Sequence, residues 1–197
     1  MAIIISSPKY LPNEADAVNS LFENGMNIFH LRKPNSNYFE LEELLAKINP
    51  DFYSRITIHY YFKFVNKFNI GGVHFSLNSF TPKIITQFIG KRISVSCHTL
   101  DEIINLRFNF DYVFLSPIFE SISKKNYKSK FVFAELKKSL AKEKQNKVIA
   151  LGGITPQNQP QAKAIGFAET AVLGYLWNKY KGKDSIPKLI EKFGELK

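Results

Sequence analysis

The feature that most constrains this chain is the regular alternation of short apolar, β-branched runs with segments that carry apolar residues at helical spacing. The strand candidates are Ala2–Ser6, Ile28–Leu31, Arg55–His59, Gly72–Phe75, Ile93–Cys97, Tyr112–Leu115, Val148–Leu151 and Ala171–Leu173. Strands separated by helices run parallel, because each helix returns the chain to the same edge of the sheet. Repeats of about 25 residues predict an α/β fold, a single (β/α)8 TIM barrel over residues 1–197.

The segments between these runs predict the helices. Apolar residues at helical spacing are clearest in Glu14–Glu23 and Phe39–Lys47, and a final helix is expected over Ile186–Phe193 with Asp184 or Ser185 as its N-cap. The weaker candidates are Phe62–Phe68, Pro82–Phe88, Leu100–Leu106, Phe133–Glu143 and Gln157–Ala164. A doubly wound open sheet is the alternative fold. No Gly-x-Gly-x-x-Gly follows the first strand, which argues against its dinucleotide-binding version.

The net charge of +10 is the one unusual bulk property, and it favours anionic ligands. Because no nucleic-acid-binding module is recognisable, we expect no nucleic-acid partner. No apolar run reaches the roughly 18 residues of a membrane span, so no membrane association is expected. Cys97 is the single cysteine, which excludes an internal disulfide, and a cytoplasmic location is the simplest interpretation.

Functional residues of such a barrel are expected at the carboxyl ends of the strands and in the loops that follow. Arg32, after the second strand, has the planar donor set that grips a phosphate or carboxylate, although a rim salt bridge is the alternative. His30 alternates with Arg32 and is a candidate acid/base, or a packed interior histidine. We take both as catalytic candidates.

The loop after the sixth strand is long and polar, as substrate loops often are. Lys124 is its catalytic candidate, since its amine could neutralise a phosphate, and Ser121 and Ser123 offer hydroxyls for binding. The alternative for Lys124 is a solvated surface lysine. His98, after the fifth strand, is a candidate for substrate binding or a structural residue.

Two glycine-containing strand ends give the strongest physical signal. Gly152 and Gly153 follow the seventh strand, and Leu173 and Gly174 follow the eighth. TIM barrels commonly hold a phosphate at these two positions through backbone N–H groups, and glycine lets the backbone approach the anion closely. The alternative is that barrel closure alone requires these tight turns.

In combination, these stretches resemble the thiamine phosphate synthase and TenI family. The similar segments are His30-Leu31-Arg32, Gly72-Val73-His74, Ser94 to Thr99, Asp111-Tyr112-Val113, Ser116 to Phe119 with Lys124, and Ala150 to Ile154. They occur in the family's order over nearly the whole chain. The resemblance implies a (β/α)8 barrel, small phosphorylated thiazole and pyrimidine metabolites as partners, and leaves a homodimer open.

The resemblance also implies an activity. The synthase joins hydroxymethylpyrimidine diphosphate to thiazole phosphate and releases pyrophosphate with the help of magnesium. Arg32, Ser96 and Lys124 match positions that contact the diphosphate. Gly153, Leu173 and Gly174 match the thiazole phosphate site.

Four residues, at three places in the chain, depart from the synthase pattern. His59-Tyr60 replaces Asn-Asp, Ser79 replaces a magnesium-binding aspartate, and Pro34 replaces a lysine. We therefore predict no metal ligand, and expect Mg2+ as a cofactor only if synthase activity is retained. A TenI-like thiazole tautomerase, a non-catalytic binder of thiazole phosphate or thiamine phosphate, and a sugar-phosphate isomerase or epimerase are the alternatives. Pro117 stands at the TenI branch's catalytic histidine, so His30 or Glu120 would have to substitute.

Overall fold

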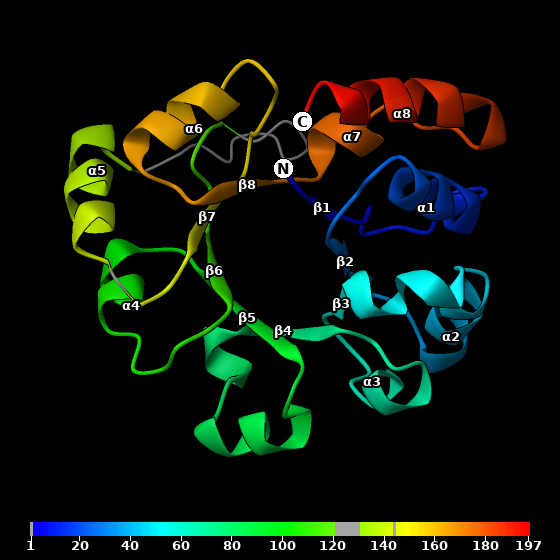
Figure 1. Cartoon of the computed structure of the whole chain (residues 1–197), viewed down its shortest axis with the longest axis horizontal. Helices are drawn as coiled ribbons and strands as arrows, with labels where there is room; N and C mark the ends of the chain where they lie inside the picture. Colours follow the sequence, from blue (N-terminus) through cyan, green and yellow to red (C-terminus); the bar gives the residue numbers. More distant parts are fainter. Residues whose placement is uncertain (1, 121–130, 144) are drawn as a thin grey trace.

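The computed structural model of the chain describes residues 2–120, 131–143 and 145–197. Within these ranges, short parallel strands close into one barrel in chain order, with β1 paired to both β2 and β8 (Figure 1). The strands are β1 (Ile3–Ile5), β2 (Phe29–Leu31), β3 (Ile56–Ile58), β4 (Gly72–Ser76), β5 (Arg92–Cys97), β6 (Tyr112–Leu115), β7 (Val148–Leu151) and β8 (Glu169–Val172). The predicted (β/α)8 barrel is confirmed.

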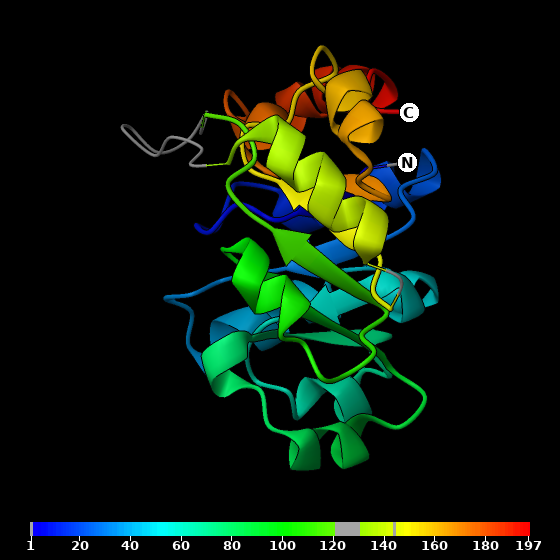
Figure 2. The same cartoon turned by 90° about the vertical axis from the view of Figure 1, so that its left-hand side faces the viewer.

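The helices surround the barrel, as Figures 1 and 2 show from two directions. They are α1 (Glu14–Glu23), α2 (Tyr38–Ala46), α3 (Phe64–Lys67), α4 (Leu100–Ile104), α5 (Phe133–Lys142), α6 (Gln159–Ile165), α7 (Gly174–Trp177) and α8 (Ile186–Gly194), with 3-10 turns at Pro50–Arg55, Leu77–Ser79, Pro82–Phe88 and Lys183–Ser185. Ser185 is the N-cap of α8, as predicted. None of these helices is both long and apolar enough to cross a membrane.

The segment Pro82–Phe88 forms a helix with the predicted bounds, and this helix is of the 3-10 type. Its β-branched run Ile84-Ile85-Thr86 disfavours the α-helix, because branched side chains lose rotamer freedom against the preceding turn. The hydroxyl of Thr86 also donates to the carbonyl of Lys83 (2.9 Å), which competes with the backbone ladder.

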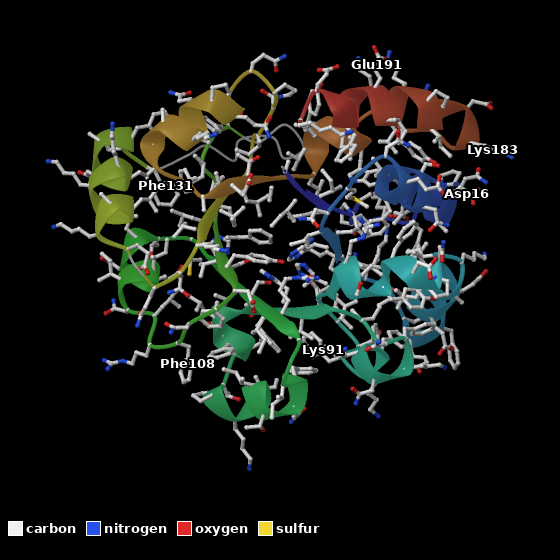
Figure 3. The ribbon with its side chains drawn as sticks, in the orientation of Figure 1. Asp16, Lys91, Phe108, Phe131, Lys183 and Glu191 are labelled. Carbon is white, nitrogen blue, oxygen red and sulfur yellow. The ribbon has the colours of Figure 1, made fainter. Side chains whose placement is uncertain are left out.

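Strand residues alternate between two cores. One set of side chains packs outward against the helices, as Val73, Val95 and Val113 do. The other set fills the barrel, where Ile3, Ile5, Tyr112, Phe114, Ile149 and Ala171 form a separate cluster. Charged residues such as Asp16, Lys183 and Glu191 lie on the outer surface (Figure 3). The alternation follows from the two-residue period of a strand.

The barrel interior is unusually polar on the side formed by β2 to β5. His30, His74, Thr57 and Ser94 are buried there, on strands whose outward faces are apolar. Branched aliphatic residues are the common filling of such barrels, and buried polar groups require hydrogen-bond partners. This half of the interior therefore holds a connected polar cluster directly beneath the strand ends.

Candidate functional site

A cavity of about 670 Å3 opens at the carboxyl ends of the strands. Its lining comes from both halves of the chain, from Arg32, His59 and His74 on one side to Leu151, Gly152 and Gly174 on the other. A volume of this size suits a small organic ligand. Among the described residues of its lining there is no aspartate or glutamate. The cavity is therefore suited to an anionic ligand.

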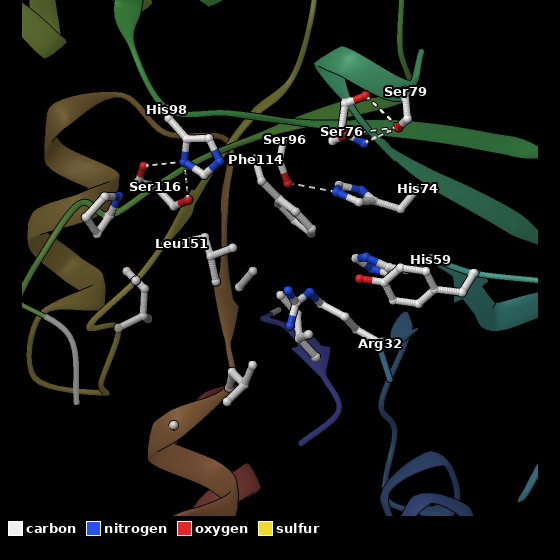
Figure 4. A pocket seen from close by; sticks show the side chains of 18 of the residues that line it. Arg32, His59, His74, Ser76, Ser79, Ser96, His98, Phe114, Ser116 and Leu151 are labelled. Atoms are coloured by element: carbon white, nitrogen blue, oxygen red, sulfur yellow. Dashed lines mark hydrogen bonds between the residues drawn. The ribbon is translucent and has the colours of Figure 1, made fainter. Parts of the chain in front are cut away.

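Arg32 projects into the cavity from the end of β2 (Figure 4). Its backbone is held on both sides by Ser6, whose Oγ accepts from the N–H of Arg32 (2.9 Å) and donates to its carbonyl (3.0 Å). Within the described ranges, no carboxylate pairs with the guanidinium. A fixed backbone and an unpaired guanidinium make Arg32 a cation available to a ligand in the cavity.

The glycine pair after β7 forms a tight turn on the opposite wall. Gly152 and Gly153 have φ values of 95° and 66°, in the region that favours glycine. A Cβ on Gly152 would lie 2.8 Å from Cα of Pro117, and a Cβ on Gly153 would lie 2.3 Å from the carbonyl oxygen of Glu120. Both glycines are therefore required by backbone conformation and by close packing, in addition to any role toward a ligand.

Side-chain and backbone hydrogen bonds fix this wall. The amide of Asn158 donates to the carbonyl of Gly153 (2.8 Å), and its Oδ1 accepts from the N–H of Thr155 (2.9 Å). Next to it, the indole N–H of Trp177 in α7 donates to the buried carbonyl of Ile5 (2.7 Å), which ties the segment after β8 to β1. These hydrogen bonds fix the two glycine-containing loops in place as one wall of the cavity.

His98 and Ser116 lie together at the rim, beyond β5 and β6 (Figure 4). Nδ1 of His98 is 3.1 Å from the carbonyl oxygen of Ser116 and 3.3 Å from its Oγ. A carbonyl only accepts, so the proton of the neutral ring resides on Nδ1 when this bond forms. Nε2 of His98 then carries a lone pair that can accept a proton.

Three histidines come together on the side of the cavity that carries Arg32. Nδ1 of His30 lies 3.0 Å from Nε2 of His59, and the rings of His59 and His74 have centroids 4.3 Å apart. Nε2 of His30 is hydrogen-bonded to the hydroxyl of Tyr112 at 2.6 Å. Because His59 and His74 line the cavity, this cluster is part of its wall.

The histidines of this cluster are neutral at physiological pH. Burial lowers the pKa of His74 to about 3, and the cation of Arg32 adds to the shift. Burial is also the main reason why the pKa values of His30 and His59 lie well below the ordinary value. Neutral imidazoles can still accept and donate hydrogen bonds, and they are the form that binds metal ions.

Most of the sequence-predicted site residues lie in the cavity wall: Arg32, Ser96, His98, Gly152, Gly153, Leu173 and Gly174. His30 is fully buried behind His59 and is not part of the lining. Ser121, Ser123 and Lys124 lie outside the described residues.

The site prediction omitted several lining residues. His59 directly follows β3 and His74 lies within β4, and both line the cavity. Tyr60 and Tyr61 follow β3 and add aromatic surface to the rim. The position directly after β3 could have identified His59, Tyr60 and Tyr61, and the alternation of inward-facing strand residues could have identified His74.

The described lining does not fit a protein-held magnesium ion. Mg2+ requires oxygen ligands and is usually held by carboxylates. At the positions where the synthase carries acidic residues, this chain has Tyr60 and Ser79, and the hydroxyl of Ser79 is engaged with the carbonyl of Ser76 (3.0 Å). The imidazoles of His59 and His74 present nitrogen instead.

Comparisons with known proteins agree with this geometry. The family model described as thiamine monophosphate synthase matches residues 2–176. The thiamine-phosphate synthase of Latilactobacillus sakei subsp. sakei (strain 23K) is 35% identical over 95 residues, 47% of this chain and 42% of that protein. The enzyme of the same name from Anoxybacillus flavithermus is 34% identical over 104 residues, 52% of this chain and 48% of that protein. This chain thus spans less than half the length of these relatives.

The structural likeness extends over nearly the whole chain. Thiamine phosphate pyrophosphorylase from Bacteroides thetaiotaomicron has 32% identity and a TM-score of 0.83, covering 99% of this chain and 94% of that one. The protein of the same name from Pyrococcus furiosus has a TM-score of 0.74 at 16% identity, covering 98% and 96%, and shows the fold alone. The predicted family is confirmed: the chain belongs to the thiamine monophosphate synthase family.

Proposed function

We propose that the protein is an enzyme that joins hydroxymethylpyrimidine diphosphate to thiazole phosphate, giving thiamine phosphate and pyrophosphate. The observation that carries this proposal is the pair of anion-binding features in one cavity. Arg32, with which no carboxylate of the described residues pairs, stands on one side of it, and the loops of Gly152–Gly153 and Gly174 form the other. Two substrates that each carry a phosphate or diphosphate group would need two such anion-binding positions in one cavity.

In the proposed reaction, the bond between the pyrimidine methylene carbon and the diphosphate oxygen breaks, and the diphosphate leaves with the bonding electrons. The ring nitrogen of the thiazole donates its electron pair to the same carbon and forms the new C–N bond. Arg32 stabilises the charge that develops on the leaving diphosphate, as a fixed cation does best at a site screened from water. The glycine loops hold the thiazole phosphate through backbone N–H groups.

The proposal assigns separate roles to the other predicted residues. Ser96 and Lys124 assist Arg32 at the diphosphate, with Ser121 and Ser123 as additional donors from the same loop. Ser96 lies in the cavity wall, where its Oγ is hydrogen-bonded to Nε2 of His74 (2.8 Å). Leu173 and Gly174 complete the phosphate site at the end of β8.

The test is a turnover assay with both substrates, with and without Mg2+, in which pyrophosphate and thiamine phosphate are measured separately. We expect equal amounts of both products from the native chain. Arg32→Gln should lose most of the rate, by roughly 10²- to 10³-fold, the range for a donor that stabilises developing charge. Binding of both substrates without product formation would overturn the proposal in favour of a non-catalytic binder.

Thiazole tautomerase activity is the second candidate, and the geometry of His98 favours it. The carbonyl of Ser116 orients Nδ1 of His98, which leaves Nε2 able to move a proton within the cavity. His98→Asn should then abolish exchange of the thiazole proton with solvent deuterium while thiazole phosphate still binds. Undiminished exchange in this variant would exclude His98 as the proton carrier.

A further inference from the structure

In the cluster of His30, His59 and His74, ring nitrogens of all three side chains converge, which packing of the rings alone does not require. One ring nitrogen from each residue lies within 4.8 Å of the other two, with no carboxylate among the three. The three side chains come from neighbouring strands: His30 lies within β2, His59 directly follows β3, and His74 lies within β4. Adjacent parallel strands thus bring three imidazole donors to one point on the cavity wall.

The spacing of these nitrogens is close to that of a metal site. Tetrahedral Zn2+ binds imidazole nitrogen at about 2.0–2.1 Å, so neighbouring donors lie about 3.3 Å apart. Nδ1 of His30 and Nε2 of His59 are already 3.0 Å apart. A small separation of these two rings, with rotation of His74 toward them, would give three donors to one ion. Nε2 of His74 would then exchange its hydrogen bond to Oγ of Ser96 (2.8 Å) for the metal ion.

In His30 and His74, the ring nitrogen that would point away from the metal ion is hydrogen-bonded, as it usually is in metal sites. A metal-binding histidine usually has its second nitrogen hydrogen-bonded, which orients the ring. Nε2 of His30 is hydrogen-bonded to the hydroxyl of Tyr112 (2.6 Å), and Nδ1 of His74 to Oγ of Ser94 (2.8 Å). Phe114 packs against His30 and His74, with ring centroids 4.8 and 5.1 Å away, and limits their motion.

The charges around the cluster determine what else the site must bind. The cations of Arg32 and Arg92 both act on these histidines electrostatically. Two neighbouring cations disfavour a bare divalent ion, and they favour an ion whose remaining ligand is an anion. His59, His74 and Arg32 line the cavity, so a fourth ligand could enter from it.

We propose that His30, His59 and His74 form a binding site for a divalent transition-metal ion that prefers nitrogen ligands, of which Zn2+ is the representative. Three imidazoles hold the ion, and its fourth position faces the cavity and takes water or an oxygen of an anionic ligand. The site is distinct in chemistry from an oxygen-ligand magnesium site, and it stands independently of the reaction proposed above.

Co2+ is the probe for the test, because tetrahedral Co2+ has strong visible absorption and binds to zinc sites. The tag-free protein is titrated with CoCl2, and Zn2+ is then added to displace it. We expect one Co2+ per chain with a tetrahedral spectrum that Zn2+ abolishes. Addition of pyrophosphate should change the spectrum by replacing water at the fourth position.

The variants are chosen so that a failure to fold cannot be mistaken for loss of the site. His59→Gln should abolish the tetrahedral spectrum. Tyr112→Phe, which keeps the ring and removes the hydrogen bond to His30, should weaken Co2+ binding by about 10–100-fold. His98→Gln is the matched control, because His98 is the fourth and last histidine of the chain and lies outside the cluster.

Two results would overturn the proposal. The first is the absence of tetrahedral Co2+ in the folded native protein at millimolar metal. The second is binding that His59→Gln and Tyr112→Phe leave unchanged while their circular dichroism matches the native chain. Neither result bears on the turnover assay, which can succeed or fail without a metal ion in this cluster.

Discussion

The ion pair between Lys33 and Glu14 gives the sharpest prediction for stability. Nζ of Lys33 donates to both carboxylate oxygens of Glu14 (2.6 and 2.7 Å) and to the carbonyls of Ser7 (2.9 Å) and Lys9 (2.8 Å). The Lys33 side chain is 0% exposed and that of Glu14 is 2% exposed. This one amine therefore joins the loop after β1, helix α1 and the loop after β2 next to Arg32.

The substitution Lys33→Met removes the amine and leaves a buried carboxylate whose remaining donor among the described residues is the N–H of Leu11 (3.1 Å). Loss of one partner of a buried pair costs about 3–5 kcal/mol of the free energy of unfolding. For a chain of this length, each kcal/mol lowers Tm by about 2–4 °C, so the expected decrease is about 6–20 °C. Lys33→Met/Glu14→Leu removes both charges and should recover about half of this loss or more.

The pH dependence separates charge from packing. Burial raises the pKa of Glu14, and removal of Lys33 raises it further. Because the pKa of Glu14 is higher in the folded chain than in the unfolded chain (about 4.3), its contribution to stability is fully present below that value. This contribution is lost as pH rises through the pKa of the folded state. The penalty of Lys33→Met should therefore be larger at pH 8 than at pH 5. Urea unfolding at several pH values measures it; a penalty equal at all pH values and in the double variant would refute the reasoning.

Three further predictions concern the glycine turn, the histidines and a helix cap. Gly153→Ala should destabilise the protein more than Gly90→Ala by at least about 1 kcal/mol, because both have positive φ but only the Cβ at Gly153 meets backbone; urea midpoints compare them. In the metal-free protein, the free energy of unfolding should fall as pH drops from about 6.5 toward 3, because the histidines of the cluster bind protons in the unfolded chain but stay neutral in the folded one. His59→Gln should lower the slope of this free energy against pH by the equivalent of about one proton. Asn37→Ala breaks the capping box with Glu40 and should cost about 1 kcal/mol in thermal melts, whereas an unchanged Tm would deny the cap a role.

The hydrophobic periodicity was sufficient to predict the barrel, because each helix and strand is short and shows one clear spacing of apolar residues. The helix Glu14–Glu23 and the strands Tyr112–Leu115 and Val148–Leu151 have the predicted bounds. Both helix and strand patterns depend on local spacing, which a single sequence displays. The segment Pro82–Phe88 has the predicted bounds but forms a 3-10 helix, because the β-branched residues Ile84, Ile85 and Thr86 disfavour the α-helix.

The candidate site was predictable only where one strand end suffices to identify it. Arg32, Gly152 and Gly174 stand at recognisable positions, and all three line the cavity. The histidine cluster was not found, because it depends on the register between β2, β3 and β4. For His30, the alternation of strand residues predicted a position inside the barrel. The alternation could not show that His59 covers His30 and keeps it out of the cavity wall.

The central claim is that one cavity holds a diphosphate at Arg32 and a thiazole phosphate at the glycine loops. Calorimetric titration of the native chain, Arg32→Gln and Gly174→Asp with pyrophosphate and with thiazole phosphate tests it most directly. We expect Arg32→Gln to weaken mainly pyrophosphate binding and Gly174→Asp to weaken mainly thiazole phosphate binding. Both variants weakening both ligands equally, or neither ligand binding to the native chain, would contradict it.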